Sequence, residues 1–221
     1  MVQGPGFDRV QAWLVLGSVL ITLAAVAAHA QEPMAAAPKN YRLELENDFV
    51  RVIRATLASR DHVPVHQHPT FPTVYVYLTD AGPTRFTHIT PSYTIERAPV
   101  RAGGVRYNRN AHIETHVVDH LSDMASEYLR IELKTTPDTP HPDVRISPED
   151  MTPVEDGQVR ISRHVCAAGA ACDAPARPSV VVSWTDRTIA WSEPGVTAPR
   201  RNGTPSALHQ IWIELKTRPI K

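Results

Sequence analysis

The chain has 221 residues, in which 23 lysines and arginines balance 23 aspartates and glutamates. A surface with no net charge argues against nucleic acid or an acidic membrane as the partner. The 20 prolines are nearly twice the usual share, and long helical periodicity is scarce. Both features favour an all-β fold of short strands joined by turns.

Residues 1–30 have the pattern of an export signal. An apolar run, Trp13–Ala27, is followed by the small-x-small sequence Ala28-His29-Ala30. This predicts a Sec-type signal peptide that is cleaved after Ala30, which leaves Gln31 as the first mature residue. The alternative is an uncleaved membrane anchor, but the run is shorter than the roughly 20 residues that span a bilayer. We therefore expect a periplasmic or secreted protein with no stable membrane anchor after cleavage.

The mature chain begins with a flexible leader, residues 31–40, and continues with short segments rich in β-branched and aromatic residues. Strands are expected within 41–57, where Asn47-Asp48 marks a turn, and at 63–69, 74–78, 85–90, 93–97, 105–108, 117–118 and 128–133. The turn at 79–83 suggests that the strands on either side of it pair as neighbours. The best candidate for a helix is 119–127.

Residues 137–153 are rich in proline and poor in apolar periodicity, which predicts a stiff linker between a domain at 41–136 and a second lobe at 154–221. Three segments of the second lobe repeat segments of the first domain in the same order. Residues 155–161, 180–186 and 211–219 correspond to 46–52, 74–80 and 129–137. This order indicates an internal duplication. The repeat is shorter in the second lobe, which is expected to lack about one hairpin.

A cluster of histidines points to metal chemistry. In the strand expected at 63–69, His66 and His68 are alternate residues and therefore point to the same face. A third imidazole from a distant strand would complete a site, and neutral imidazole suits Zn, Fe, Ni, Cu or Mn. The alternative is a pair of surface histidines beside a proline.

These segments resemble the cupin superfamily, with the pieces Asn47-Asp48-Phe49-Val50-Arg51-Val52, His66-Gln67-His68-Pro69, Val74–Leu78, His116–His120 and Ile131-Glu132-Leu133-Lys134. The resemblance covers 41–136 well and 154–219 weakly, so it implies a degenerate tandem bicupin. It implies a double-stranded β-helix, the jelly-roll barrel, with the histidines in its mouth. Cupins often pair through sheet edges, so a homodimer is also implied.

The resemblance also implies a divalent metal held by two histidines, a glutamate and a third histidine. Pro72 and Thr73 stand where the family has the glutamate. The set that remains is His66, His68 and His116, with Fe, Zn, Mn or Ni as the metal. His112 and Glu114 are the candidates for a fourth ligand, and no catalytic residue stands out. His120, in place of the family's asparagine, is expected to lie beside the site or in solvent.

The second lobe has lost this ligand set. The internal repeat places Cys172, Ala174 and Ala198 where the first domain has His66, His68 and His116. We therefore expect a structural role for the lobe, as the cover of a sheet edge or as an interface. Cys166 and Cys172 either form a small-loop disulfide or remain free thiols.

Two functions are compatible with these patterns. The first is an exported cupin-like protein that binds a divalent metal in its N-terminal barrel and binds or transforms a small polar molecule. The alternative is a metal-free binding or structural barrel without enzymatic activity, because a fold does not decide a function.

Overall fold

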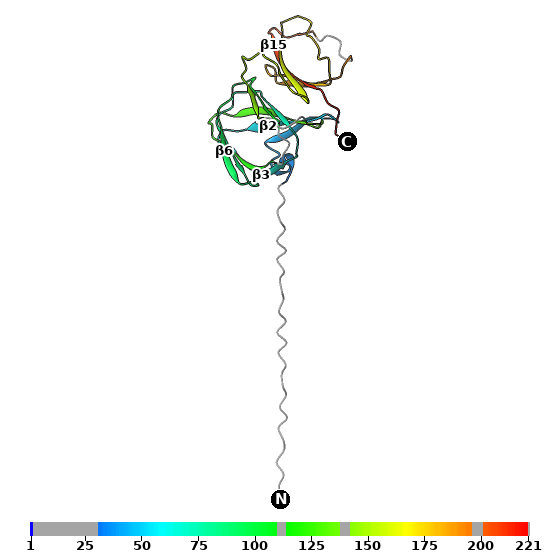
Figure 1. Ribbon diagram of the computed structural model, residues 1–221. Helices are drawn as coiled ribbons and strands as arrows, with labels where there is room; N and C mark the ends of the chain where they lie inside the picture. The colour runs from blue at the N-terminus through cyan, green and yellow to red at the C-terminus, as the bar shows by residue number, and fades with distance from the viewer. Residues whose placement is uncertain (2–30, 110–113, 138–141, 196–200, 221) are drawn as a thin grey trace.

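The protein is built from antiparallel strands in three sheets (Figure 1). The structure, a computed structural model, describes residues 1, 31–109, 114–137, 142–195 and 201–220. Within these residues there is one helix, α1 (Pro33–Ala36), and no helix long and apolar enough to cross a lipid bilayer.

The largest sheet has six strands, in the order β1 (Tyr41–Glu46), β2 (Val50–Leu57), β9 (Ser126–Leu133), β4 (Thr73–Tyr77), β7 (Val105–Asn108) and β10 (Val144–Ile146). A four-stranded sheet has the order β3 (His62–His68), β8 (Glu114–His120), β5 (Thr84–His88) and β6 (Tyr93–Arg97). The five-stranded sheet has the order β11 (Val154–Glu155), β12 (Val159–Cys166), β15 (Leu208–Leu215), β13 (Ser179–Ser183) and β14 (Thr188–Ser192).

The six-stranded sheet is the middle of three layers. One hydrophobic cluster joins it to the five-stranded sheet, and a second cluster joins its other face to the four-stranded sheet. Figure 1 shows β15 on one side of β2, and β3 and β6 on the other side. Both faces of the middle sheet are therefore buried.

The sequence of β4 explains the two faces, because alternate residues of a strand point in opposite directions. Val74 and Val76 belong to the core shared with the five-stranded sheet, whereas Tyr75 and Tyr77 belong to the core shared with the four-stranded sheet. Burying each valine contributes about 1.5 kcal/mol or more to folding. The tyrosines bury their rings and bring hydroxyl groups toward the histidine-bearing sheet.

The prediction of an all-β jelly-roll fold is confirmed. The internal repeat is also seen in the strand pairing: residues that correspond in the two halves pair with residues that also correspond. The corresponding pairs are Val52 with Ile131 and Ile161 with Ile213, then Val74 with Ile131 and Val180 with Ile213. Of the two roles expected for the second lobe, the cover of a sheet edge or an interface, the packing agrees with an interface: its sheet covers a face of the six-stranded sheet.

Two local predictions are wrong. The strands β4 and β5 lie in different sheets, since β4 pairs with β7 and β9 while β5 pairs with β6 and β8. The segment 119–127 contains no helix: it comprises the end of β8, a connection and the start of β9. In both places local turn and helix signals are overridden by pairing with distant strands.

Residues 31–40 are ordered and do not form the flexible leader that we predicted. Glu32 caps α1 by accepting a hydrogen bond from the Met34 amide at 3.2 Å. The amide of Gln67 donates to the Gln31 carbonyl at 2.8 Å, so this segment is attached to β3. Within the predicted linker 137–153, strand β10 extends the six-stranded sheet.

Cys166 and Cys172 form a disulfide bond, which decides between the two alternatives left by the sequence. It closes a short loop at the end of β12. The domain boundaries predicted at 136 and 154 stay predictions.

Candidate metal centre

A β-bulge in β3 turns two histidines into the protein. Val63 pairs with Val118 and His66 pairs with His116, so β3 has one residue more than β8 between these two pairs. The extra residue changes which positions face inward, because a bulge breaks the strict alternation of a strand. His62 and Pro64 are therefore exposed, whereas His66 and His68 are buried.

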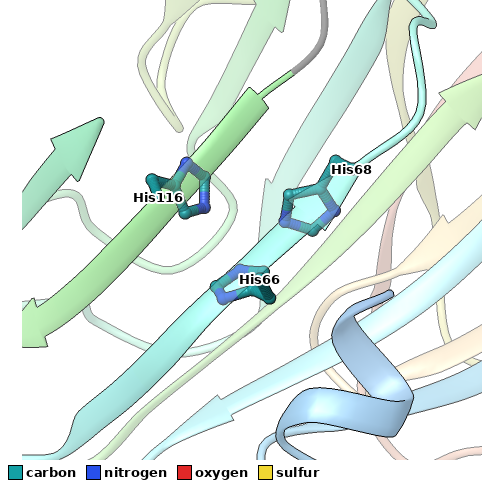
Figure 2. A group of neighbouring side chains, drawn as sticks. All are labelled: His66, His68 and His116. Atoms are coloured by element: carbon teal, nitrogen blue, oxygen red, sulfur yellow. The ribbon is translucent and has the colours of Figure 1, made fainter. Parts of the chain in front are cut away.

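His116 lies directly opposite His66 on the neighbouring strand β8. The ring centroid of His66 is 4.7 Å from that of His116 and 4.9 Å from that of His68, and His68 and His116 are 5.3 Å apart. Figure 2 shows the three rings gathered on one side of the two strands. One ring nitrogen from each histidine can be chosen so that all three lie within 4.8 Å of one another. The structure therefore brings together the three histidines that the sequence analysis selected.

Hydrogen bonds determine the proton position on His66. Its Nδ1 lies 2.8 Å from the carbonyl oxygen of Pro64, which can only accept, so Nδ1 carries the proton. The lone pair is then on Nε2, and the hydroxyl group of Tyr41 donates to it at 3.1 Å. Nε2 is the nitrogen that is available as a ligand.

Burial keeps the cluster uncharged. It lowers the pKa of His66, and it lowers the pKa values of His68 and His116 well below the usual range, with nearby Arg130 adding to the effect. Neutral imidazole is the form that binds metals. The Nδ1 atoms of His68 and His116 are buried without a hydrogen-bond partner among the described residues. These donors fit a divalent metal.

A buried ion-pair network lies beside the cluster. Arg130 donates to the carboxylate of Glu114 at 2.7 Å, to that of Glu132 at 2.9 Å and to the hydroxyl group of Tyr75 at 2.6 Å. A carboxylate oxygen of Glu132 is 3.6 Å from Nδ1 of His68. Arg130 holds the pKa of Glu114 far below its usual range despite burial, so Glu114 is a carboxylate.

Glu114 lies on the same face of β8 as His116, as predicted, but its carboxylate pairs with Arg130 in this structure. Its role as a fourth ligand stays a prediction. His112, the other candidate, lies outside the described residues, as does Ala198. His120 is buried, with Nδ1 2.8 Å from the carbonyl of Ala58 and Nε2 3.3 Å from the hydroxyl of Ser126, so both nitrogens are used.

Sequence analysis missed four residues of this site: Tyr41, His88, Arg130 and Glu132. His88 lies 5.1 Å from the ring of His116 and stacks on Tyr93. The signal for Arg130 and Glu132 was the strand Ser126–Leu133, in which charged residues occur within an otherwise buried stretch. Buried charges are rare unless they are paired, so this stretch indicated a partner on another strand.

No protein-family model matches the sequence, and no curated protein matches it. Several solved structures are similar to this chain. One is a cupin domain from Bordetella pertussis Tohama I, with 19% identity, 42% of this chain and 91% of that chain covered, and a TM-score of 0.36. Another is YhaK from Escherichia coli, with 15% identity, coverage of 83% and 89%, and a TM-score of 0.48.

Quercetin 2,3-dioxygenase from Acinetobacter baumannii is similar at 13% identity, with 81% of this chain and 84% of that chain covered and a TM-score of 0.44. At these identities the likeness concerns the fold alone, and neither activity nor substrate follows from it. The strand orders of the described residues agree with the jelly-roll fold that the cupin resemblance implied, and membership of that superfamily stays a prediction.

Proposed function

We propose that this protein is an exported cupin-like protein that binds a divalent metal through His66, His68 and His116 and binds or transforms a small polar molecule. The observation that carries the proposal is the convergence of three buried imidazoles whose ligand atoms lie within 4.8 Å of one another. Three neutral nitrogen donors suit Fe, Zn, Mn or Ni. A metal bound by these three histidines would supply a Lewis acid that activates water, and a redox-active ion such as Fe could also bind dioxygen.

The surrounding residues have defined roles in this proposal. Pro64 holds the His66 ring in the tautomer that puts the lone pair on Nε2, a common support for a metal ligand. A metal bound there would take the place of the hydrogen bond from Tyr41. The Tyr41 hydroxyl, which is 3.1 Å from that nitrogen, is placed to donate a hydrogen bond to a group bound next to His66. Arg130 compensates two carboxylates beside the histidines, and the burial of all three rings excludes bulk water.

Metal content tests the proposal. The protein is purified without a histidine tag, incubated with Fe, Zn, Mn or Ni, dialysed and measured by elemental analysis. We expect about one metal ion per chain in the wild type and none in His66→Ala or His116→Ala. His62→Ala is the matched control, because His62 is an exposed histidine on the same strand. Circular dichroism verifies that each variant is folded.

A wild type that retains no metal would contradict the proposal. The alternative, a metal-free binding or structural barrel, would then stand. Stability gives a second measurement, because a metal that binds only the folded chain stabilises it by about 4 kcal/mol at a thousand times its Kd.

We also propose export to the periplasm or the medium, with cleavage after Ala30. The apolar run and small-residue site support it, and so does the disulfide, because such bonds persist in oxidising compartments. Mass spectrometry of the chain from a periplasmic extract tests this: the expected first residue is Gln31. A homodimer, as in many cupins, remains a proposal that light scattering in solution can test.

A further inference from the structure

A cavity that none of the three histidines lines lies beside strands β6, β7 and β10. It has a volume of about 360 Å³ and lies between the segment that links β6 to β7 and the segment that follows β10. Four arginines line it, and no aspartate or glutamate is among its described lining residues. They are Arg97, Arg101, Arg106 and Arg145.

Two of these arginines stand directly opposite each other in the six-stranded sheet. Arg106 of β7 pairs with Arg145 of β10, so their side chains lie on the same face. Like charges in such a pair destabilise a sheet unless an anion compensates them. Asp143 accepts a hydrogen bond from Arg106 at 2.5 Å, whereas Arg145 has no acidic partner among the described residues. The pair therefore has one anion for two cations.

Arg97 and Arg106 also have free donors. The Nε of Arg97 and the Nε and Nη1 of Arg106 are buried and have no hydrogen-bond partner among the described residues. Leaving such donors unsatisfied is costly. These three nitrogens are closed to solvent, so an oxyanion in the cavity would not reach them and would instead compensate the positive charge of the two buried side chains. The Arg97 guanidinium lies over the ring of Phe86, 3.9 Å from its centroid, which fixes it at the cavity wall.

The remaining lining residues are mostly apolar: Val100, Val105 and Ile146, with Pro99 and Pro148. The volume is within the range of small-molecule sites, which combine apolar walls with a few placed polar groups. Guanidinium groups bind carboxylates and phosphates through paired hydrogen bonds. We propose that this cavity binds a small organic oxyanion with a compact apolar body, held by Arg97, Arg106 and Arg145.

The second lobe holds the cavity in shape. Arg163 donates to the carbonyl of Gly103 at 2.7 Å and to that of Ser147 at 2.9 Å, so it joins the two segments that border the cavity. Gly103 has a φ of +78°, and a Cβ atom there would lie 2.7 Å from the ring of Trp184. The oxyanion site therefore depends on contacts from the five-stranded sheet, which gives that sheet a functional role.

The site is distinct from the histidine cluster, and the proposal does not depend on a bound metal. None of the three histidines lines the cavity. The Phe86 ring contacts the ring of His116, 5.4 Å between centroids, and also the guanidinium group of Arg97, 3.9 Å from its centroid.

Calorimetric titration of the purified chain with benzoate, phenyl phosphate and benzamide tests the proposal. We expect saturable binding of benzoate or phenyl phosphate, at least tenfold weaker binding of neutral benzamide, and weaker binding at high salt. The tighter of the two anions assigns the site to carboxylates or to phosphates. Arg97→Gln and Arg145→Gln should each weaken binding at least tenfold, the loss expected for one charge-assisted hydrogen bond.

Two controls make the result decisive. Arg85→Gln removes an exposed arginine that pairs with Glu96 outside the cavity, and it should bind like the wild type. His66→Ala should also bind the anion normally. Equal binding of benzamide, unchanged binding in both arginine variants, loss of binding in His66→Ala, or no saturation with either anion would each overturn the proposal.

Discussion

In the first half of the protein β9 lies between β2 and β4, and in the second half β15 lies between β12 and β13 in the same register. A lysine after each central strand binds the turn before its neighbour. Lys134 donates to the carbonyl of Asn47 at 2.8 Å, and Lys216 donates to that of Asp156. The two halves therefore share a backbone scaffold down to individual hydrogen bonds.

They differ at alternate positions of the same strands. Ile131 and Ile213 both point into the shared core, whereas their neighbours Arg130 and Trp212 point to opposite outer faces. Arg130 faces the four-stranded sheet and its histidines, and Trp212 stacks on His164, 3.5 Å between ring centroids. The face that forms the common core is apolar in both halves. Among the described residues, the candidate metal centre lies where the four-stranded sheet covers the other face.

Removing the buried cation should have the largest effect. Arg130→Met removes the buried cation that Glu114 and Glu132 share, so we expect the free energy of unfolding to fall by about 3–5 kcal/mol. Urea unfolding followed by circular dichroism measures this loss. Adding Glu114→Gln to Arg130→Met should restore part of it.

Arg85→Met is the control for this prediction. Its pair with Glu96 is exposed, and the expected loss is at most about 1 kcal/mol. Equal losses in the two variants would show that the network beside the histidines does not contribute through its burial.

Acidification should destabilise the metal-free protein, because the buried histidines of its first half resist protonation in the folded state. Burial lowers the pKa values of His68 and His116, so the unfolded chain binds protons below about pH 6.5 while the folded chain does not. Stability is therefore full above that pH and decreases as the pH falls, by up to about 3 kcal/mol per pH unit for the two groups.

The measurement is urea unfolding in the presence of a chelator between pH 8 and 5. His116→Ala should reduce the slope, and Val65→Ala, an exposed neighbour on β3, should leave it unchanged. A wild-type profile that is flat over this range would mean that the imidazoles are not held neutral.

The shared core can be tested by matched cavities. Ile131→Ala and Ile213→Ala remove equivalent buried side chains, and each should cost about 2 kcal/mol or more. Outside residues 1–30, every tryptophan lies in the second half, at Trp184, Trp191 and Trp212. Because one core joins the two halves, the unfolding transition followed by tryptophan fluorescence should shift in Ile131→Ala as much as in Ile213→Ala. A fluorescence transition that Ile131→Ala does not shift would show that the halves unfold independently.

The sequence predicted the histidine cluster because two signals that can be read from the sequence alone select its members. Strand alternation puts His66 and His68 on one face, and the cupin pattern indicated His116. The bulge between Val63 and His66 that turns them inward was not visible, since a single inserted residue is defined only against the partner strand. The same reason explains the wrong pairing of β4 with β5: a turn between two strands does not determine whether they share a sheet.

The charged residues of β9 indicated a partner on another strand, but the identity of that partner could not be predicted, because it depends on which charged residues of separate strands meet in the interior. Arg130 and Glu114 are brought together by the packing of two sheets, not by spacing along one strand. The order of residues 31–40 similarly comes from tertiary contact: the backbone hydrogen bond to Gln67 of β3 and the buried side chain of Ala37.

The smallest expected effect concerns the feature in which the two halves agree most closely. Lys134→Met and Lys216→Met each remove a charged hydrogen bond to a turn carbonyl and a pair with a partly exposed glutamate, Glu46 or Glu155. Because these groups are partly solvated, we expect a loss of about 1 kcal/mol or less in each variant. The two lysines have no partner in common, so the losses should add in the double variant.

Equal, additive losses in urea unfolding would mean that each lysine fixes its own turn, and that the halves differ only in what covers their outer faces. A loss confined to Lys134→Met would instead mean that the turn beside the histidine-bearing half has a stabilising role which its counterpart lacks.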